Sequence, residues 1–267
     1  MATRRRLDQE LVRRGLARSR EHAADLVADG RVLVGGRAAT KVATAVEPAA
    51  ALLVKEIEDG EEYVSRGGHK LAGALDTFEP LGLSVRGRRC LDAGASTGGF
   101  TDVLLRRGAA AVVAVDVGYG QLAWSLRSDP RVTVLDRTNV RDLTPDMVGE
   151  AVDVVVADMS FISLRLVLAP LYAVCAPGAD LALMVKPQFE VGRERVGKGG
   201  VVRDPDLRAQ AVLSVARAAA DVGLGVAGVT ASSLPGPSGN VEYFLWLRAD
   251  AAEVDPADVH RAVDEGP

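Results

Sequence analysis

Cysteine and histidine are scarce in this chain of 267 residues, and their few positions exclude several kinds of site. The two cysteines, Cys90 and Cys175, both lie in apolar stretches, which predicts small core residues rather than a disulfide or a metal pair. The three histidines are scattered, and no Cys/His/Asp cluster has metal-ligand spacing, so we expect no metal. Unpaired cysteines are also typical of a reducing cytoplasm.

Long apolar runs are missing as well. No segment approaches the roughly 18 apolar residues that would cross a bilayer. The start, Met1-Ala-Thr-Arg-Arg-Arg-Leu7, lacks the apolar centre of a signal peptide. No Gly-x-Ser-x-Gly elbow indicates hydrolase chemistry. We therefore expect a soluble, cytoplasmic protein that has no membrane partner, and nothing in the sequence indicates an obligate protein partner.

Basic residues are concentrated at the amino-terminal end. Residues 1–45 contain ten Lys and Arg against five Asp and Glu, whereas the whole chain has a net charge of −4. An excess confined to one small unit favours contact with nucleic-acid phosphates over a merely solvated helix face. Aromatic residues are few there, which favours reading of shape and phosphates over base stacking. The candidate RNA contacts in this part are Arg4, Arg5, Arg6, Arg13, Arg14, Arg18, Arg20 and Lys41.

The order of predicted elements indicates two domains. Residues 1–58 predict two short helices, a hairpin at Gly35-Gly36 and a strand at 51–54. The polar, acidic stretch that follows predicts a linker at 59–63, so that the second domain is 64–267. From about residue 88 strands and helices alternate, as in a parallel sheet. The strands are expected near 89–93, 111–116, 132–136, 152–158, 179–185, 225–231 and 241–248.

The sharpest local signal is the turn Leu91-Asp-Ala-Gly-Ala-Ser-Thr-Gly-Gly-Phe100. An apolar strand ends here in an acid and turns through glycines into a helix, which is where nucleotide-type folds hold a cofactor. The spacing differs from the G-x-G-x-x-G that brings a backbone close to a pyrophosphate, so a dinucleotide is disfavoured. The alternative is a tight strand-to-helix connection that binds no ligand.

Acids at the next strand ends favour a cofactor with a ribose but no phosphate, S-adenosylmethionine. Asp116 ends the second strand, where a carboxylate can accept hydrogen bonds from ribose hydroxyls. Residues 136–139 follow the third strand, where an adenine edge would be read. The candidate cofactor ligands are Asp92, Gly94, Ala95, Ser96, Thr97, Gly98, Gly99, Phe100, Asp116, Val117, Asp136, Arg137, Asn139 and Asp158.

Four charged residues form the candidate catalytic set: Lys70, Asp158, Lys186 and Glu242. The last three fall at predicted strand ends, and Lys186 ends the apolar run Leu181–Val185, an unusual place for a lysine. A ribose hydroxyl is a poor nucleophile, so its methylation benefits from a base that takes the proton. The motif Asp158-Met-Ser-Phe161 lacks the prolines that are typical of base N-methylation. A lysine that extends from the strand end into solvent is the alternative interpretation of Lys186.

The stretch 187–204 is the longest without predicted regular structure, and it contains four glycines. Long stretches of this kind are often binding loops or lids, although a merely solvated loop is equally compatible with the sequence. Arg193 and Arg195 in this stretch, and Arg66 at the start of the second domain, complete the candidate RNA contacts.

Six segments resemble the motifs of the TlyA family of ribosomal RNA 2′-O-methyltransferases, which are sometimes labelled hemolysin A. They are 64–71, 91–101, 116–122, 157–163, 185–190 and 235–244. The resemblance implies an S4-like RNA-binding domain of α+β class before an FtsJ-like domain of α/β class. The latter is expected to be a Rossmann-like, S-adenosylmethionine-dependent methyltransferase with a seven-stranded, mostly parallel sheet. It also implies that Lys70, Asp158, Lys186 and Glu242 are the catalytic set.

The implied substrate is a cytidine 2′-hydroxyl in ribosomal RNA of the 30S subunit, the 50S subunit or both. Two other functions stay open from the sequence. A membrane-active hemolysin would need amphipathic or spanning segments, and none is evident. An RNA-binding ribosome-assembly factor with little turnover would not need an intact catalytic set.

Overall fold

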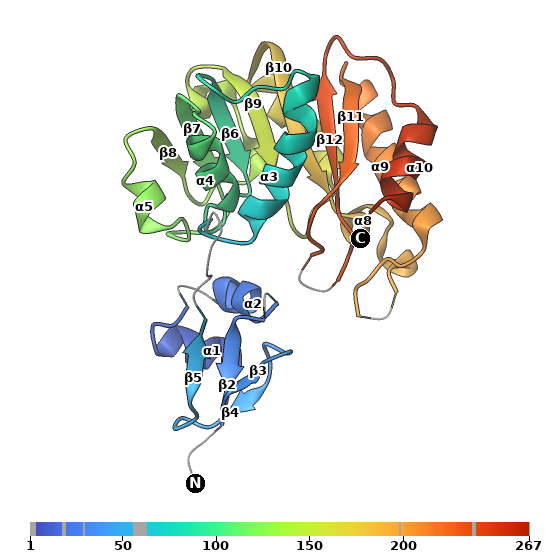
Figure 1. Cartoon of the computed structure of the whole chain (residues 1–267). Helices are drawn as coiled ribbons and strands as arrows, with labels where there is room; N and C mark the ends of the chain where they lie inside the picture. Colours follow the sequence, from blue (N-terminus) through green and yellow to red (C-terminus); the bar gives the residue numbers. More distant parts are fainter. Residues whose placement is uncertain are drawn as a thin grey trace. The chain divides into compact units, whose positions relative to one another are not determined.

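The computed structural model describes residues 4–17, 20–28, 30–55, 63–197, 199–236 and 239–266 (Figure 1). The contacts between residues divide the chain into two compact units, 1–66 and 67–267. Most of the predicted linker at 59–63, and the candidate RNA contact Arg18, lie outside the described residues.

The first unit is a small α+β domain. Its elements are β1 (Arg5–Arg6), α1 (Leu7–Arg13), α2 (Arg20–Ala28), β2 (Val32–Val34), β3 (Arg37–Ala38), β4 (Ala45–Val46) and β5 (Leu52–Val54). The strands pair as β1-β4 and as β3-β2-β5. Leu7, Leu11 and Leu26 are buried together with Val32 and Val46, so one apolar face of each helix packs on the short strands. The predicted helices, hairpin and last strand are confirmed, whereas β1 and β4 were not predicted.

The second unit is built on a seven-stranded sheet. Its strands are β6 (Arg89–Ala93), β7 (Ala111–Val115), β8 (Val132–Leu135), β9 (Val152–Ala157), β10 (Cys175–Val185), β11 (Gly225–Ala231) and β12 (Tyr243–Arg248). The order is β11-β12-β10-β9-β6-β7-β8, and β12 runs in the opposite direction to the other six strands. The predicted mostly parallel sheet is confirmed. Its apolar strands are buried on both faces because helices cover them.

Helices and short 3-10 turns connect these strands. The helices are α3 (Gly67–Phe78), α4 (Gly99–Arg106), α5 (Trp124–Arg127), α6 (Pro145–Val148), α7 (Leu168–Ala173), α8 (Pro187–Glu190), α9 (Pro205–Ala220) and α10 (Pro256–Asp264). The 3-10 turns are η1 (Glu79–Leu81), η2 (Val140–Asp142), η3 (Leu164–Leu166) and η4 (Arg193–Arg195). Among the described helices, none combines the length and hydropathy that crossing a bilayer requires. Figure 1 shows α3 and α4 side by side against the sheet.

The stretch 187–204 is more ordered than the sequence indicates. It contains α8 and η4, and Val191 and Val202 are buried against Ala211 of α9. The Asn240 side chain donates a hydrogen bond to the Gly200 carbonyl (2.8 Å) and accepts one from the Val202 N–H (2.9 Å). Both ends of this stretch are therefore packed, and the interpretation as a merely solvated loop is wrong for them.

Candidate active site

The sheet brings three of the four catalytic candidates to one edge. Asp158 follows β9, Lys186 follows β10 and Glu242 precedes β12. Leu183 of β10 pairs with Ala157 of the parallel β9, and Val185 pairs with Tyr243 of the antiparallel β12. The residues just beyond these pairs therefore meet at the carboxyl end of β9 and β10, the edge where open α/β sheets bind ligands.

Two ion pairs join the four candidates. Lys70 of α3 donates through Nζ to Glu242 Oε2 at 2.6 Å, across a sequence separation of 172 residues, and both side chains are buried. Lys186 Nζ lies 2.5 Å from Asp158 Oδ1. The Asp158 side chain is 25% exposed and that of Lys186 is 10% exposed, so the second pair is partly accessible at the sheet edge whereas the first is enclosed. The structure thus assembles the predicted set as one buried pair and one partly accessible pair, called the accessible pair below.

Ser160 belongs to the accessible pair, although sequence reasoning did not select it. Its Oγ accepts a hydrogen bond from Lys186 Nζ at 3.0 Å. Lys186 is therefore held from two positions of the loop that follows β9. The only sequence signal for this role is the place of Ser160 two residues after Asp158.

Glu190 is a second residue that sequence reasoning missed. Its buried carboxylate accepts hydrogen bonds from Ser163 Oγ (2.5 Å) and from the Leu164 N–H (2.7 Å), and it forms an ion pair with Arg165 (3.4 Å). Glu190 thus ties the segment that begins at Lys186 to the loop that begins at Asp158. Hydrogen bonds to a buried carboxylate of this kind fix the geometry of the groups that donate them.

The glycine turn after β6 packs too closely on the rest of the protein to allow side chains at two of its positions. Gly94 has φ +82°, and a Cβ on it would lie 2.7 Å from the Asp158 carbonyl oxygen. Gly98 has φ +102°, and a Cβ there would overlap Leu126. Both positions need glycine because other residues avoid this backbone region and have no room here.

Asp116 holds this turn from the neighbouring strand end. Its Oδ2 accepts a hydrogen bond from the Ser96 N–H (2.8 Å), and its Oδ1 accepts one from the Gly118 N–H (2.6 Å). Each oxygen keeps a second lone pair that can accept from a hydroxyl. The carboxylate is therefore fixed in orientation and still has acceptor capacity for a ribose.

Asp92 is fully buried at the base of the turn. Its Oδ2 accepts a hydrogen bond from Thr101 Oγ1 (2.7 Å), whereas Oδ1 has no partner among the described residues. Burial raises the pKa of Asp92 to about 7, the charges of Asp158 and Asp116 contribute to the rise, and the Thr101 hydrogen bond opposes it. An orphaned buried acceptor beside a glycine cradle fits a ligand that brings a hydrogen-bond donor or a positive charge.

The other cofactor candidates have different surroundings. Asp136 forms an ion pair with Arg127 (2.9 Å), and the Arg137 guanidinium lies over the Tyr119 ring at 4.4 Å. The Asn139 side chain caps η2 by accepting from the Arg141 N–H. The Phe100 ring is buried against Phe244, so Phe100 can contribute only its backbone to the turn. Val117 is exposed, and Ala95, Thr97 and Gly99 are buried in the turn.

In the first unit, buried acids hold many of the RNA candidates. Asp8, 5% exposed, forms ion pairs with Arg6 (3.0 Å) and Arg20 (2.9 Å). Glu10 is fully buried and pairs with Arg13 (2.6 Å) and Arg14 (2.8 Å). The arginine hydrogen bonds lower the pKa of Asp8 and that of Glu10 to about 2. In the sequence, Asp8 and Glu10 only reduce the net positive charge of this unit. In the structure they also hold the arginine side chains in place.

The remaining RNA candidates lie apart from these acids. Arg4 pairs with Glu47 (3.2 Å), and Arg5 and Lys41 are exposed. Arg66 is half-buried at the end of the first unit. Arg193 is exposed in η4, and Arg195 donates to the Val191 carbonyl (2.7 Å). Within the described chain, no group of three or more His, Cys, Asp or Glu is placed to hold a metal ion.

Comparison with known proteins assigns both units to families. Residues 63–249 match the FtsJ-like methyltransferase model, and residues 5–51 match the S4 domain model. A protein of Mycobacterium tuberculosis H37Rv, the 16S/23S rRNA (cytidine-2′-O)-methyltransferase TlyA, is 60% identical over the full length of both chains. The chain belongs to the TlyA family of FtsJ-like methyltransferases.

Other relatives of this TlyA-family chain have hemolysin names. Hemolysin A of Brachyspira hyodysenteriae is 37% identical, with 90% of this chain and 98% of that protein covered. A hemolysin-named protein of Streptococcus thermophilus has a solved structure that superimposes with a TM-score of 0.77 at 37% identity, covering 99% of this chain and 96% of that one. The predicted family, the two fold classes and the methyltransferase class of the enzyme are thereby confirmed.

Proposed function

We propose that this chain transfers a methyl group from S-adenosylmethionine to the 2′-hydroxyl of a cytidine in ribosomal RNA of the 30S subunit, the 50S subunit or both. The observation that carries the proposal is the accessible Lys186–Asp158 pair beside the buried Lys70–Glu242 pair at the substrate edge of the sheet. The substrate class is taken from the tuberculosis relative, which is named for this reaction. The proposal places the enzyme in the cytoplasm, where ribosomal subunits are found.

The residues around the glycine turn fit the cofactor. Asp116 is placed to accept from ribose hydroxyls, and the orphaned Asp92 Oδ1 is placed for the amino group or a donor next to it. Gly94 and Gly98 let the turn pack closely on Asp158 and Leu126, which sets its shape. When bound, S-adenosylmethionine supplies an electrophilic methyl group carried on a sulfonium. All further chemistry belongs to the side chains of the protein.

The proton of the ribose hydroxyl has to leave as the new bond forms. Asp158 and Ser160 fix Lys186 Nζ at the open edge, where an amine can hydrogen-bond the hydroxyl and, in its neutral form, take the proton. Glu242 fixes Lys70 as a second amine beneath this edge.

The arginines of the first unit are proposed to contact RNA phosphates. Asp8 and Glu10 hold Arg6, Arg13, Arg14 and Arg20 in fixed orientations, which reduces the entropy lost when RNA binds. Their guanidinium groups remain partly exposed. Phosphate contact of this kind makes affinity fall steeply with salt concentration.

The test uses purified protein, labelled S-adenosylmethionine and unmodified 30S and 50S subunits. We expect label at a 2′-oxygen, and we expect Lys186→Ala to lower the rate by between about 100-fold and 10,000-fold, which is the usual contribution of a general base. Lys55→Ala is the matched control because Lys55 is an exposed lysine of the first unit.

Two outcomes would contradict the proposal. If the wild-type protein binds both subunits and labels neither, the catalytic proposal fails and an assembly factor becomes the better interpretation. If purified protein instead lyses liposomes, the membrane-active interpretation gains support.

A further inference from the structure

Three aromatic side chains are unusually exposed among the described residues. Phe161, Trp124 and Tyr119 are 92%, 79% and 67% exposed, although aromatic residues make up only 4% of the chain. All three follow the carboxyl ends of strands, Phe161 after β9 and the other two after β7. Exposed aromatic rings are thus concentrated at the edge that carries the cofactor turn and the catalytic pairs.

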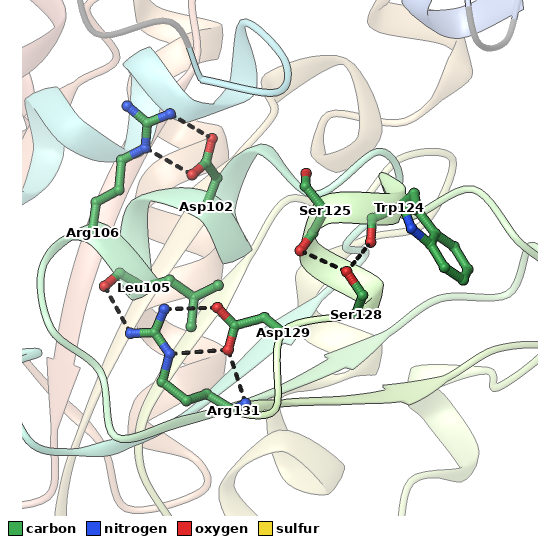
Figure 2. A network of polar contacts seen from close by, with 8 residues as sticks. All are labelled: Asp102, Leu105, Arg106, Trp124, Ser125, Ser128, Asp129 and Arg131. Atoms are coloured by element: carbon green, nitrogen blue, oxygen red, sulfur yellow. Dashed lines mark hydrogen bonds and ion pairs between the residues drawn. The ribbon is translucent and has the colours of Figure 1, made fainter.

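The backbone that carries Trp124 is firmly held. The Ala123 N–H donates to the Thr97 carbonyl of the glycine turn (3.1 Å). Ser128 Oγ donates to the carbonyl oxygens of Trp124 (2.8 Å) and Ser125 (3.4 Å), as Figure 2 shows. The indole of Trp124 points away from all of these contacts (Figure 2). An exposed ring on a fixed backbone loses little entropy when a ligand stacks on it.

The loop before Trp124 is held by the acid that follows β8. Asp136 accepts a hydrogen bond from the Gly120 N–H (3.3 Å) and pairs with Arg127 of α5 (2.9 Å). Next to it, the Arg137 guanidinium stacks on the Tyr119 ring at 4.4 Å. The loop therefore presents an indole and a phenol ring with an arginine, the combination of side chains that binds unpaired nucleobases.

The size of the surface decides what can bind there. Trp124, Tyr119 and Val117 are too few to bury the roughly 800 Å² per partner of a stable protein interface. A nucleobase needs only one ring face, and every base has one. The surface follows β7 and the catalytic pairs follow β9 and β10, all at the carboxyl edge of one sheet, with only β6 between β7 and β9, so a chain of RNA bound at this edge can reach it.

We propose that Trp124, with Tyr119 before it in the chain, forms a stacking surface for an unpaired RNA base that neighbours the methylated nucleoside. The inference rests on the proposed function because it takes RNA as the substrate. It assigns to the catalytic domain a base contact that the arginines of the first unit do not supply.

The first test measures affinity for unmodified ribosomal subunits by filter binding. Trp124→Ala should weaken binding by between about fivefold and 150-fold, the loss of one base stack, and Trp124→Phe should restore most of the affinity. Leu81→Ala is the matched control, since Leu81 is 64% exposed but lies before β6 at the opposite edge of the sheet. Wild-type affinity in Trp124→Ala would overturn the proposal, and so would failure of Trp124→Phe to restore binding.

The second test uses the fact that the chain has two tryptophans, Trp124 and the buried Trp246. Protein-free ribosomal RNA contains no tryptophan, so all tryptophan emission comes from the enzyme. Binding should quench the emission of wild-type protein and leave that of Trp124→Phe unchanged. Bound RNA without quenching would refute stacking. Absence of methyl transfer by the wild type would refute the proposed function alone, because neither binding test depends on turnover.

Discussion

Replacing Asp92 by asparagine should remove a pH-dependent loss of stability. The pKa of Asp92 is raised by burial from 3.8 to about 7, so the folded protein binds a proton that the unfolded chain has released over that range. The resulting stability is fully present below the unfolded pKa and is lost as the pH rises through the folded pKa. The whole loss is about 4 kcal/mol, and about 2.5 kcal/mol of it falls between pH 5 and pH 8.

The assay is urea unfolding of wild-type protein and Asp92→Asn at both pH values, without added cofactor. Asparagine has nearly the same shape and can still accept from Thr101, but it does not ionise. The difference in free energy of unfolding between the two proteins should therefore move by about 2.5 kcal/mol in favour of the variant as the pH rises from 5 to 8. Other titrating groups cancel in this difference because both proteins share them.

Thr101→Val is the matched control for the same reasoning. It removes the hydrogen bond that lowers the pKa of Asp92, so the loss of stability should shift to higher pH. A constant difference between wild type and Asp92→Asn across the range would refute the argument, since Asp92 would then not titrate there.

Two further predictions concern the catalytic edge. Glu190→Ala should lower kcat in the methyl-transfer assay by up to about 100-fold with little change in KM. The reason is that the loop of Asp158 loses the hydrogen bonds that Ser163 and Leu164 donate to Glu190. Arg165→Gln keeps both hydrogen bonds and should be nearly neutral in the same assay. Gly236→Ala should abolish most of the activity and leave the protein folded. The new Cβ would lie 2.6 Å from Glu242 Oε1 and displace that carboxylate from Lys70. Normal activity with an unchanged unfolding midpoint would contradict the prediction.

Local signals in the sequence determined the strands and the acids at their ends. Apolar runs such as Leu181–Val185 are typical of a sheet covered on both faces, so the positions of the strands and the fold class follow from hydrophobicity and the alternation with helices. Asp92, Asp116 and Asp158 stand where apolar runs stop, and the glycines at 94 and 98 indicate a turn that other residues cannot adopt. The carboxyl ends of parallel strands lie at one edge of the sheet, which is why Asp158 and Lys186 could be predicted to lie together.

Only the tertiary structure decided which charged side chains form ion pairs with one another. Nothing in the sequence joins Lys70 to Glu242, because that pair closes through antiparallel pairing of β12, a strand late in the chain, with β10. The raised pKa of Asp92 comes from complete burial, and the low pKa of Asp8 and Glu10 from arginines folded onto them. The roles proposed for Glu190, Ser160 and Trp124 follow from their neighbours and their exposure. Distances, dielectric surroundings and solvent access are properties of the packed molecule, and a linear pattern of residue types does not contain them.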